Sequence, residues 1–120
     1  MKNLAEYISN RDHKQRELFF LLNEILMNHK EMRSAIRYGI PFYGINRWIC
    51  YLNPKKNDAI EICFLQGKKL NEIYPFMDMK SRKMVSGMLL ENPDDFVLEQ
   101  LENVLLTAIE LDKKFTSGAN

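Results

Sequence analysis

The sequence predicts an α+β fold of two layers, in which N-terminal helices and a C-terminal helix pack on a four-stranded antiparallel sheet. The two ends of the chain carry apolar residues at helical spacing. Between them lie short segments rich in aromatic and β-branched residues, which favour strands. The turns between the first three of these segments are too short for a crossover, so neighbouring strands must run antiparallel.

Two helices are expected at the N-terminal end. Asn3 is a suitable cap for a short helix that includes Leu4, Tyr7 and Ile8. A longer helix is expected over residues 12–28, where most apolar side chains fall on one arc: Leu18, Leu21, Leu22, Ile25 and Leu26, with Phe19 at its edge. This arc predicts the side of the helix that faces the core.

Phe20 and Met27 of the longer helix point roughly opposite to this arc. One interpretation is a second packing contact with the N-terminal segment. The other is a contact between two copies in a homodimer, since exposed apolar patches mark interaction surfaces. The sequence leaves both interpretations open.

A third, short helix is expected over residues 31–37, with one side buried through Met32, Ala35 and Ile36. Gly39 is placed to end it, because glycine adopts the left-handed conformation without a Cβ penalty. Pro41 then prevents a return to helix. The four predicted strands follow and occupy Phe42-Tyr43, Arg47–Leu52, Ala59–Leu65 and Met84–Leu90. Residues 68–83 show no readable pattern.

The last helix has the clearest start signal. Asn92 is a good cap, Pro93 suits the first helical position, and Asp94 and Asp95 complement the positive end of the helix dipole. The apolar residues that follow form one broad arc that must cover the sheet: Val97, Leu98, Leu101, Val104, Leu105, Ala108, Ile109 and Phe115.

Length and composition predict one globular domain over residues 1–120, with 46% hydrophobic and 28% charged residues. The formal charge of +1 argues against a nucleic-acid partner, because such proteins usually carry a stronger basic excess. No apolar run is long enough to cross a membrane, and no signal peptide is visible. With only two cysteines, we expect reduced thiols and a cytoplasmic location.

Cys50 and Cys63 lie on neighbouring predicted strands, so a redox pair or a soft-metal site is conceivable. However, the strand that begins at Ala59 places Ile60, Ile62 and Phe64 on one face, which we expect the helices to cover. In the strand before it, the same argument from apolar burial favours a helix face made of Trp48, Cys50 and Leu52. The two thiols would then point to opposite faces, too far apart for a disulfide.

No nucleophile elbow, zinc-protease motif or phosphate-binding loop is present, so no catalytic residue and no metal ligand is predicted. The most informative stretch runs from Arg37 through the Tyr-Gly-Ile-Pro-Phe-Tyr segment to Tyr51. Tyrosine and tryptophan at the join of a helix and a sheet can line a ligand cleft. The predicted ligand-binding residues are therefore Tyr38, Pro41, Tyr43, Trp48 and Tyr51, with Lys68 and Arg82 as candidate anion anchors.

Three segments also resemble the YdhG-like family, a bacterial domain-of-unknown-function family. They are Tyr38-Gly39-Ile40-Pro41-Phe42-Tyr43, Cys50-Tyr51-Leu52-Asn53-Pro54-Lys55-Lys56 and Glu61-Ile62-Cys63-Phe64-Leu65-Gln66-Gly67. The resemblance extends over roughly residues 18–115. It implies a helix pair, an antiparallel sheet and a C-terminal helix, and, through frataxin-like members, delivery of iron by surface carboxylates. Here acidic and basic residues are interleaved on the first long helix, so no metal-binding residues are carried over.

The first interpretation of function is a non-enzymatic cytosolic binding or accessory domain without a cofactor. Its partner would be a small molecule or a protein bound near the Tyr-Gly-Ile-Pro-Phe-Tyr segment. The alternative is a frataxin-like iron chaperone for iron–sulfur or haem assembly, in which iron would be the cargo. A third interpretation is a small enzyme of unknown substrate.

Overall fold

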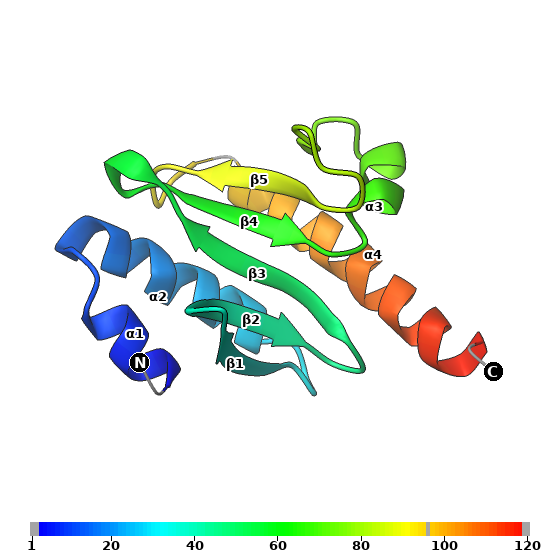
Figure 1. Ribbon diagram of the computed structural model, residues 1–120, viewed down its shortest axis with the longest axis horizontal. Helices are drawn as coiled ribbons and strands as arrows, with labels where there is room; N and C mark the ends of the chain where they lie inside the picture. Colours follow the sequence, from blue (N-terminus) through cyan, green and yellow to red (C-terminus); the bar gives the residue numbers. More distant parts are fainter. Residues whose placement is uncertain (1–2, 96, 119–120) are drawn as a thin grey trace.

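The computed structural model describes residues 3–95 and 97–118, with side chains as far as residue 114. It confirms the α+β class with N-terminal helices and a C-terminal helix, but its sheet has five strands (Figure 1). The elements in chain order are α1 Leu4–Ser9, α2 His13–Met27, β1 Arg33–Arg37, β2 Ile40–Gly44, β3 Trp48–Pro54, a 3-10 turn Lys56–Asp58, β4 Ile60–Phe64, α3 Gly67–Ile73, β5 Ser86–Leu90 and α4 Val97–Gly118.

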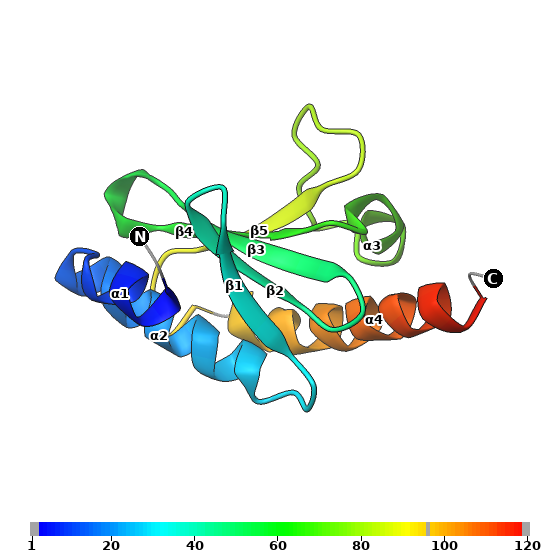
Figure 2. The same cartoon turned by 60° about the horizontal axis from the view of Figure 1, so that its bottom comes forward.

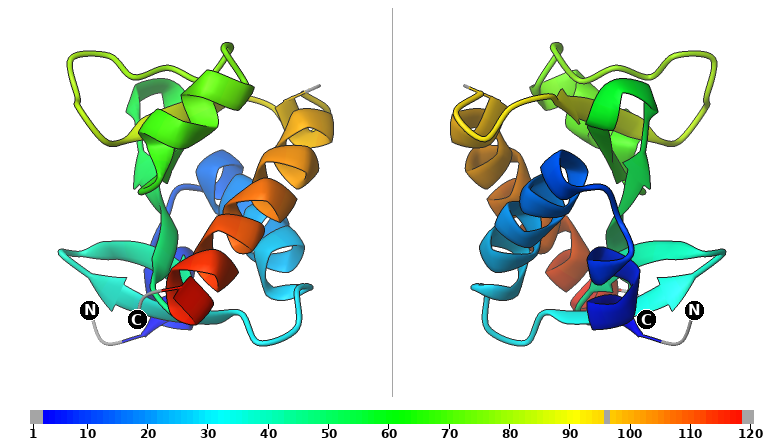
Figure 3. Two further views of the ribbon diagram at one scale, coloured as in Figure 1. Left: turned by 90° about the vertical axis from the view of Figure 1, so that its right-hand side faces the viewer. Right: turned by 90° about the vertical axis from the view of Figure 1, so that its left-hand side faces the viewer.

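The strands form an antiparallel meander in the order β1-β2-β3-β4-β5. Helices α1, α2 and α4 lie together on one face of it, and Figures 2 and 3 show the opposite face free of helices. We call that opposite surface the open face. Between β4 and β5 the chain forms α3 at the end of the sheet and then a loop that rises over the open face.

The core lies between the sheet and α1, α2 and α4. Ile60, Ile62 and Phe64 of β4 are fully buried there, which confirms the predicted orientation of this strand. They meet the arcs predicted for the helices, since Leu22 of α2 and Leu101 of α4 are fully buried in the same cluster. Burial on this scale is the main stabilising contribution to a domain of this size.

The cap predicted at Asn3 is confirmed, because its side-chain oxygen accepts a hydrogen bond from the amide of Glu6 at 2.9 Å. The longer helix has the predicted bounds within one residue at each end. On its outer surface, 55% of Phe20 and 39% of Met27 are exposed. These two side chains are therefore not covered by the N-terminal segment, and the homodimer contact stays a prediction.

The helix predicted over residues 31–37 is wrong, because Arg33–Arg37 forms the edge strand β1. A two-residue turn joins β1 to β2, with Tyr38 at φ 53° and Gly39 at φ 77°. Two consecutive left-handed residues make a tight hairpin whose twist matches that of the strands. Gly39 therefore closes a hairpin and does not end a helix, and the hairpin adds the fifth strand to the sheet.

The start predicted for the last helix is also wrong by several residues. Asn92 belongs to a turn in which its carbonyl accepts from the amide of Asp95, and α4 begins at Val97. The side chain of Asp95 accepts from the Val97 amide at 3.2 Å, so this aspartate satisfies the first turn in place of Asn92. The helix continues through Gly118, and the side chain of Phe115 lies outside the described residues.

Within the described residues, no helix combines the length and apolar character that crossing a bilayer requires.

We expect Leu101→Ala to lower the free energy of unfolding by about 2–5 kcal/mol, because it leaves a cavity in a fully buried part of the core. Leu106→Ala is the matched control, since Leu106 lies on the same helix and is 48% exposed. Urea denaturation followed by circular dichroism measures both. Equal losses for the two variants would contradict the placement of α4.

Candidate functional site

The open face is built from alternate residues of the five strands. Phe42, Tyr51, Cys63 and Gly87 are successive cross-strand partners from β2 to β5. Tyr43, the neighbour of Phe42, points the other way into the core. Strand alternation therefore places this row of four residues on the open face.

Four aromatic side chains lie in contact along β1–β3, and we call them the aromatic strip: Tyr38, Phe42, Trp48 and Tyr51. The ring of Phe42 is stacked on Tyr51 at 5.0 Å between centroids. It contacts Trp48 edge-on and Tyr38 in a tilted geometry, each at 5.9 Å. Only 7% of Phe42 is exposed, whereas 85% of Tyr38 is exposed. Phe42 is thus the base of the strip, and Tyr38 is its most accessible ring.

Trp48 was predicted to face the helices together with Cys50 and Leu52. Cys50 and Leu52 do lie in the core, but Trp48 contacts Phe42 on the open face. The reason is a β-bulge, since Tyr43 pairs with Cys50 while the next residue of β2 pairs with Trp48. The extra residue, Ile49, joins the core and reverses the direction of the tryptophan.

Two arginines of β1 lie over the strip. The guanidinium of Arg33 is 4.2 Å from the centre of the Trp48 ring, and that of Arg37 is 5.6 Å from the Trp48 and Tyr38 rings. Both arginines are exposed. Among the described residues, neither forms an ion pair with a carboxylate. A guanidinium that stacks on a ring keeps its edge free to bind an anion.

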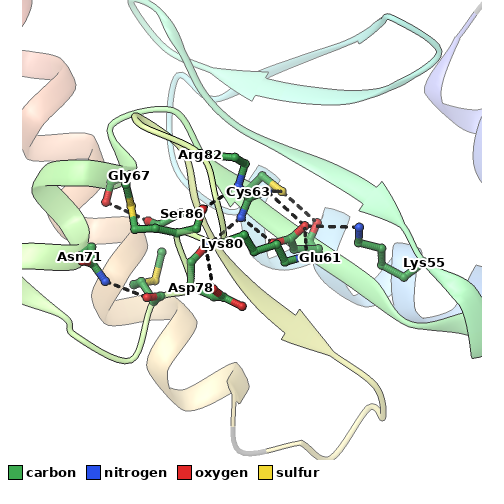
Figure 4. A network of polar contacts seen from close by, with 11 residues as sticks. Lys55, Glu61, Cys63, Gly67, Asn71, Asp78, Lys80, Arg82 and Ser86 are labelled. Carbon is green, nitrogen blue, oxygen red and sulfur yellow. Dashed lines mark hydrogen bonds and ion pairs between the residues drawn. The ribbon is translucent and has the colours of Figure 1, made fainter.

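The other half of the open face carries a buried carboxylate. Only 3% of the Glu61 side chain is exposed, and three cations surround it. Arg82 donates to it at 2.9 Å, while the ammonium groups of Lys80 and Lys55 lie at 3.4 and 3.7 Å (Figure 4). Three cations around one carboxylate leave an excess of two positive charges in this network.

The network holds the loop of residues 78–83 over β4 and β5. Asp78 pairs with Gly87 through two backbone hydrogen bonds of 2.9 Å, and Arg82 donates to the carbonyl of Asp78. A Cβ at Gly87 would collide with the carboxylate of Glu61, so the glycine makes room for the ion pair. The loop therefore covers one half of the open face and leaves the aromatic strip uncovered.

The pKa values of Glu61 and Cys63 follow from the contacts that these two side chains make. Burial alone would raise the pKa of Glu61, but the hydrogen bonds from Arg82 and Cys63 and the nearby positive charges lower it overall. Burial raises the pKa of the Cys63 thiol to about 11, helped by the charge of Glu61. Glu61 is thus ionised and Cys63 is protonated at neutral pH, so Cys63 is not an activated nucleophile.

The two cysteines are free and lie on opposite faces, which confirms the prediction made from the strand pattern. Cys50 pairs across the sheet with Phe64 and lies in the core, whereas Cys63 pairs with Tyr51 and contacts Arg82 on the open face. They cannot share a disulfide or a metal ion in this arrangement.

The residues predicted as a ligand site fall into separate places. Tyr38, Trp48 and Tyr51 meet in the aromatic strip. Tyr43 lies on the opposite face, where its hydroxyl donates to Asn23 at 2.9 Å, and Pro41 is buried on that same side. Arg82 pairs with Glu61, and Lys68 is exposed on α3, away from the strip.

Sequence reasoning missed Arg33, Arg37, Phe42 and Glu61. The first two were placed in a helix, where their alternate spacing had no meaning. The signal that could have found them is the Tyr38-Gly39 pair, because a two-residue turn ahead of a strand predicts a second strand in front of it. With that strand in place, Arg33 and Arg37 fall on one face.

Charge is distributed unevenly along the chain. Residues 33–90, which form the sheet and its connections, contain ten lysines and arginines against four acidic residues. Residues 91–114, which include most of α4, contain seven acidic residues against two lysines. The net charge of +1 hides this separation. The segment that forms the sheet and its connections is therefore basic, and the segment that contains most of α4 is acidic.

A cavity of about 480 Å³ lies at the end of the open face beside the Glu61 network. Lys55, Lys56 and Lys80 line it together with Glu91 and the exposed side chain of Leu89. Three lysines against one glutamate leave the lining with a positive excess, and Leu89 makes it partly apolar. The cavity extends the basic character of the open face beyond the aromatic strip.

Among the side chains described, no three histidine, cysteine, aspartate or glutamate residues gather to hold a metal ion. Glu61 is surrounded by cations, which disfavour a metal there. The frataxin-like interpretation therefore has no candidate ligand set in this part of the chain.

The fold is that of a DUF1801 family protein. The crystal structure of that family's YdhG from Bacillus subtilis matches this structure with a TM-score of 0.62 and 15% sequence identity, over 97% of this chain and 90% of that chain. This match confirms the expected resemblance to the YdhG-like family at the level of the fold. No family model and no curated protein matches the sequence.

We expect Glu61→Gln to lower the free energy of unfolding by about 1–3 kcal/mol at neutral pH, because it removes the charge that holds three cations. Since the pKa of Glu61 is lowered in the folded state, its contribution is present above the unfolded pKa of 4.5 and is lost as the pH falls through the folded value. Denaturant titrations between pH 3 and 7 should therefore show the two proteins converging in acid.

The control is Glu17→Gln, which removes the carboxylate of the exposed pair with His13. Exposed pairs contribute little, so this variant should stay within about 0.5 kcal/mol of the wild type throughout. A difference between wild type and Glu61→Gln that does not change with pH would contradict the ionised network.

Proposed function

We propose that this domain is a non-enzymatic binding module whose open face holds an anionic ligand with a flat apolar group. The single observation that carries the proposal is the contact of Arg33 and Arg37 with Trp48, in which two exposed guanidinium groups lie on an aromatic ring. Flat groups can stack beside the rings of the strip, while the edges of the arginines bind the anion.

The site is preorganised, which favours binding. Phe42 fixes the other three rings of the strip by direct contact, and the Nε of Arg33 donates to the carbonyl of Ile45 at 3.3 Å. The residues belong to paired strands, apart from Tyr38, which lies in the two-residue turn between β1 and β2. Groups held in place before binding lose less conformational freedom when the ligand arrives.

The proposal narrows the predicted site. Tyr38, Trp48 and Tyr51 keep a role as the stacking surface, and Arg33 and Arg37 take the role of anion anchors. Arg82 acts on the neighbouring half, where it holds the 78–83 loop against Glu61. The positive charges around the site support an anionic ligand, because they raise the local concentration of anions.

Phenyl phosphate is a simple probe of this site, and Trp48 is the only tryptophan of the chain. We expect phenyl phosphate to change the Trp48 fluorescence and to bind more tightly than cyclohexyl phosphate, which has the charge but not the flat ring. In the variant Arg33→Gln/Arg37→Gln the affinity should fall about tenfold, which corresponds to about 1.4 kcal/mol.

Lys14→Gln is the control, because Lys14 is an exposed cation on α2, away from the open face. It should leave the affinity unchanged. Equal binding of the two phosphates, or an unchanged affinity in the double variant, would refute the proposed function.

A further inference from the structure

We propose that the anionic ligand of the open face is single-stranded nucleic acid, with bases stacked on the aromatic strip and phosphates bound along its borders. The inference rests on the proposed function and names the class of its ligand. It departs from the expectation drawn from the overall charge, because the basic residues are concentrated in residues 33–90, which form the sheet and its connections.

The strip offers a stacking surface of the kind that unpaired bases use. Tyr38 is almost fully exposed, and Trp48 and Tyr51 are partly exposed beside it. The guanidinium planes over Trp48 add a second surface for stacking. Aromatic rings and arginine planes on a sheet bind splayed bases of either RNA or single-stranded DNA.

Positive charge borders the strip on both sides. Arg33 and Arg37 lie along β1, and the Glu61 network with its excess of two positive charges lies over β4. At a spacing of about 4.8 Å between strands, β1 and β4 are separated by about 14 Å. A backbone that crosses this distance meets cations at both ends while its bases lie on the rings between them.

The cavity beside Lys55, Lys56 and Lys80 continues the path beyond β4. Its volume of about 480 Å³ and the exposed side chain of Leu89 allow one more base to rest next to basic side chains. A duplex does not fit this chemistry, because its bases are already stacked on one another and cannot reach the strip. The alternative partner is an acidic peptide. Its carboxylates would bind Arg33 and Arg37, but it does not supply a flat group to stack on each ring of the aromatic strip.

The test uses fluorescein-labelled ten-nucleotide oligo(U) and oligo(dT), a duplex of equal length and an acidic peptide that contains tyrosine. At about 50 mM salt we expect the single strands to bind more tightly than the duplex and to quench Trp48. Tyr38→Asn removes the exposed ring, and asparagine tolerates the left-handed backbone of this turn. It should lower the affinity for the single strands about tenfold.

Arg33→Gln and Arg37→Gln should each weaken binding and reduce the slope of log affinity against log salt by about 0.7, the value for one phosphate contact on a single strand. Lys14→Gln should change neither the affinity nor the slope. Thermal unfolding checks that every variant is folded. Oligo(U) bound more tightly than oligo(dT) would assign the site to RNA, and equal binding would assign it to single strands of both kinds.

Three results would overturn the inference: a duplex that binds as tightly as the single strands, a Tyr38→Asn variant with unchanged affinity, or binding of the acidic peptide alone. In the last case phenyl phosphate should still bind in a manner that depends on Arg33 and Arg37, and the proposed function would stand. If neither phenyl phosphate nor any oligonucleotide binds, both the inference and the proposed function fail.

Discussion

The carboxylate of Glu61 lies on β4, next to the edge strand β5, on the face that the helices leave uncovered. A buried charge of this kind is costly unless cations and hydrogen bonds compensate it. Lys55, at the end of β3, and Lys80 and Arg82, in the loop before β5, provide that compensation. The need to neutralise one side chain therefore folds a distant loop back over β4 and β5.

This requirement divides the sheet into two halves of different character. One half is closed by polar contacts around Glu61 and by the close approach of the carboxylate to Gly87. The other half carries the aromatic rings and the two arginines of β1. Since the helices cover the reverse side, the aromatic half is the one part of the described sheet with large rings at its surface. The location of the site thus follows from the way the protein satisfies a single buried charge.

The sequence predicts what depends on apolar periodicity. The helical arc of α2, the inward residues of β4 and the burial of Leu101 all follow from repeated spacing. Residues 31–37 were misassigned because seven residues are too few to distinguish a helical from an alternating pattern. The glycine of the Tyr38-Gly39 pair hints at a two-residue turn, but a left-handed tyrosine beside it is rare, so the pair was interpreted as the end of a helix.

The candidate site was only partly predictable for a related reason. The aromatic residues are close in sequence, so their clustering on the sheet could be expected. The bulge that turns Trp48 outward depends on the pairing of β2 with β3. In the sequence Glu61 cannot be distinguished from a surface glutamate, because its three cations come from other segments. Such features arise from contacts between distant segments, which local patterns do not report.

The separation of acidic and basic residues gives the domain a permanent electric dipole that runs from α4 to the sheet. With a net charge of only +1, attraction from a distance is weak, but a dipole still experiences a torque near a charged surface. Close to a polyanion, the molecule would rotate until the sheet leads and α4 trails. Salt screens this interaction beyond about 8 Å at physiological ionic strength, so the dipole sets the direction of approach only in the last steps before contact.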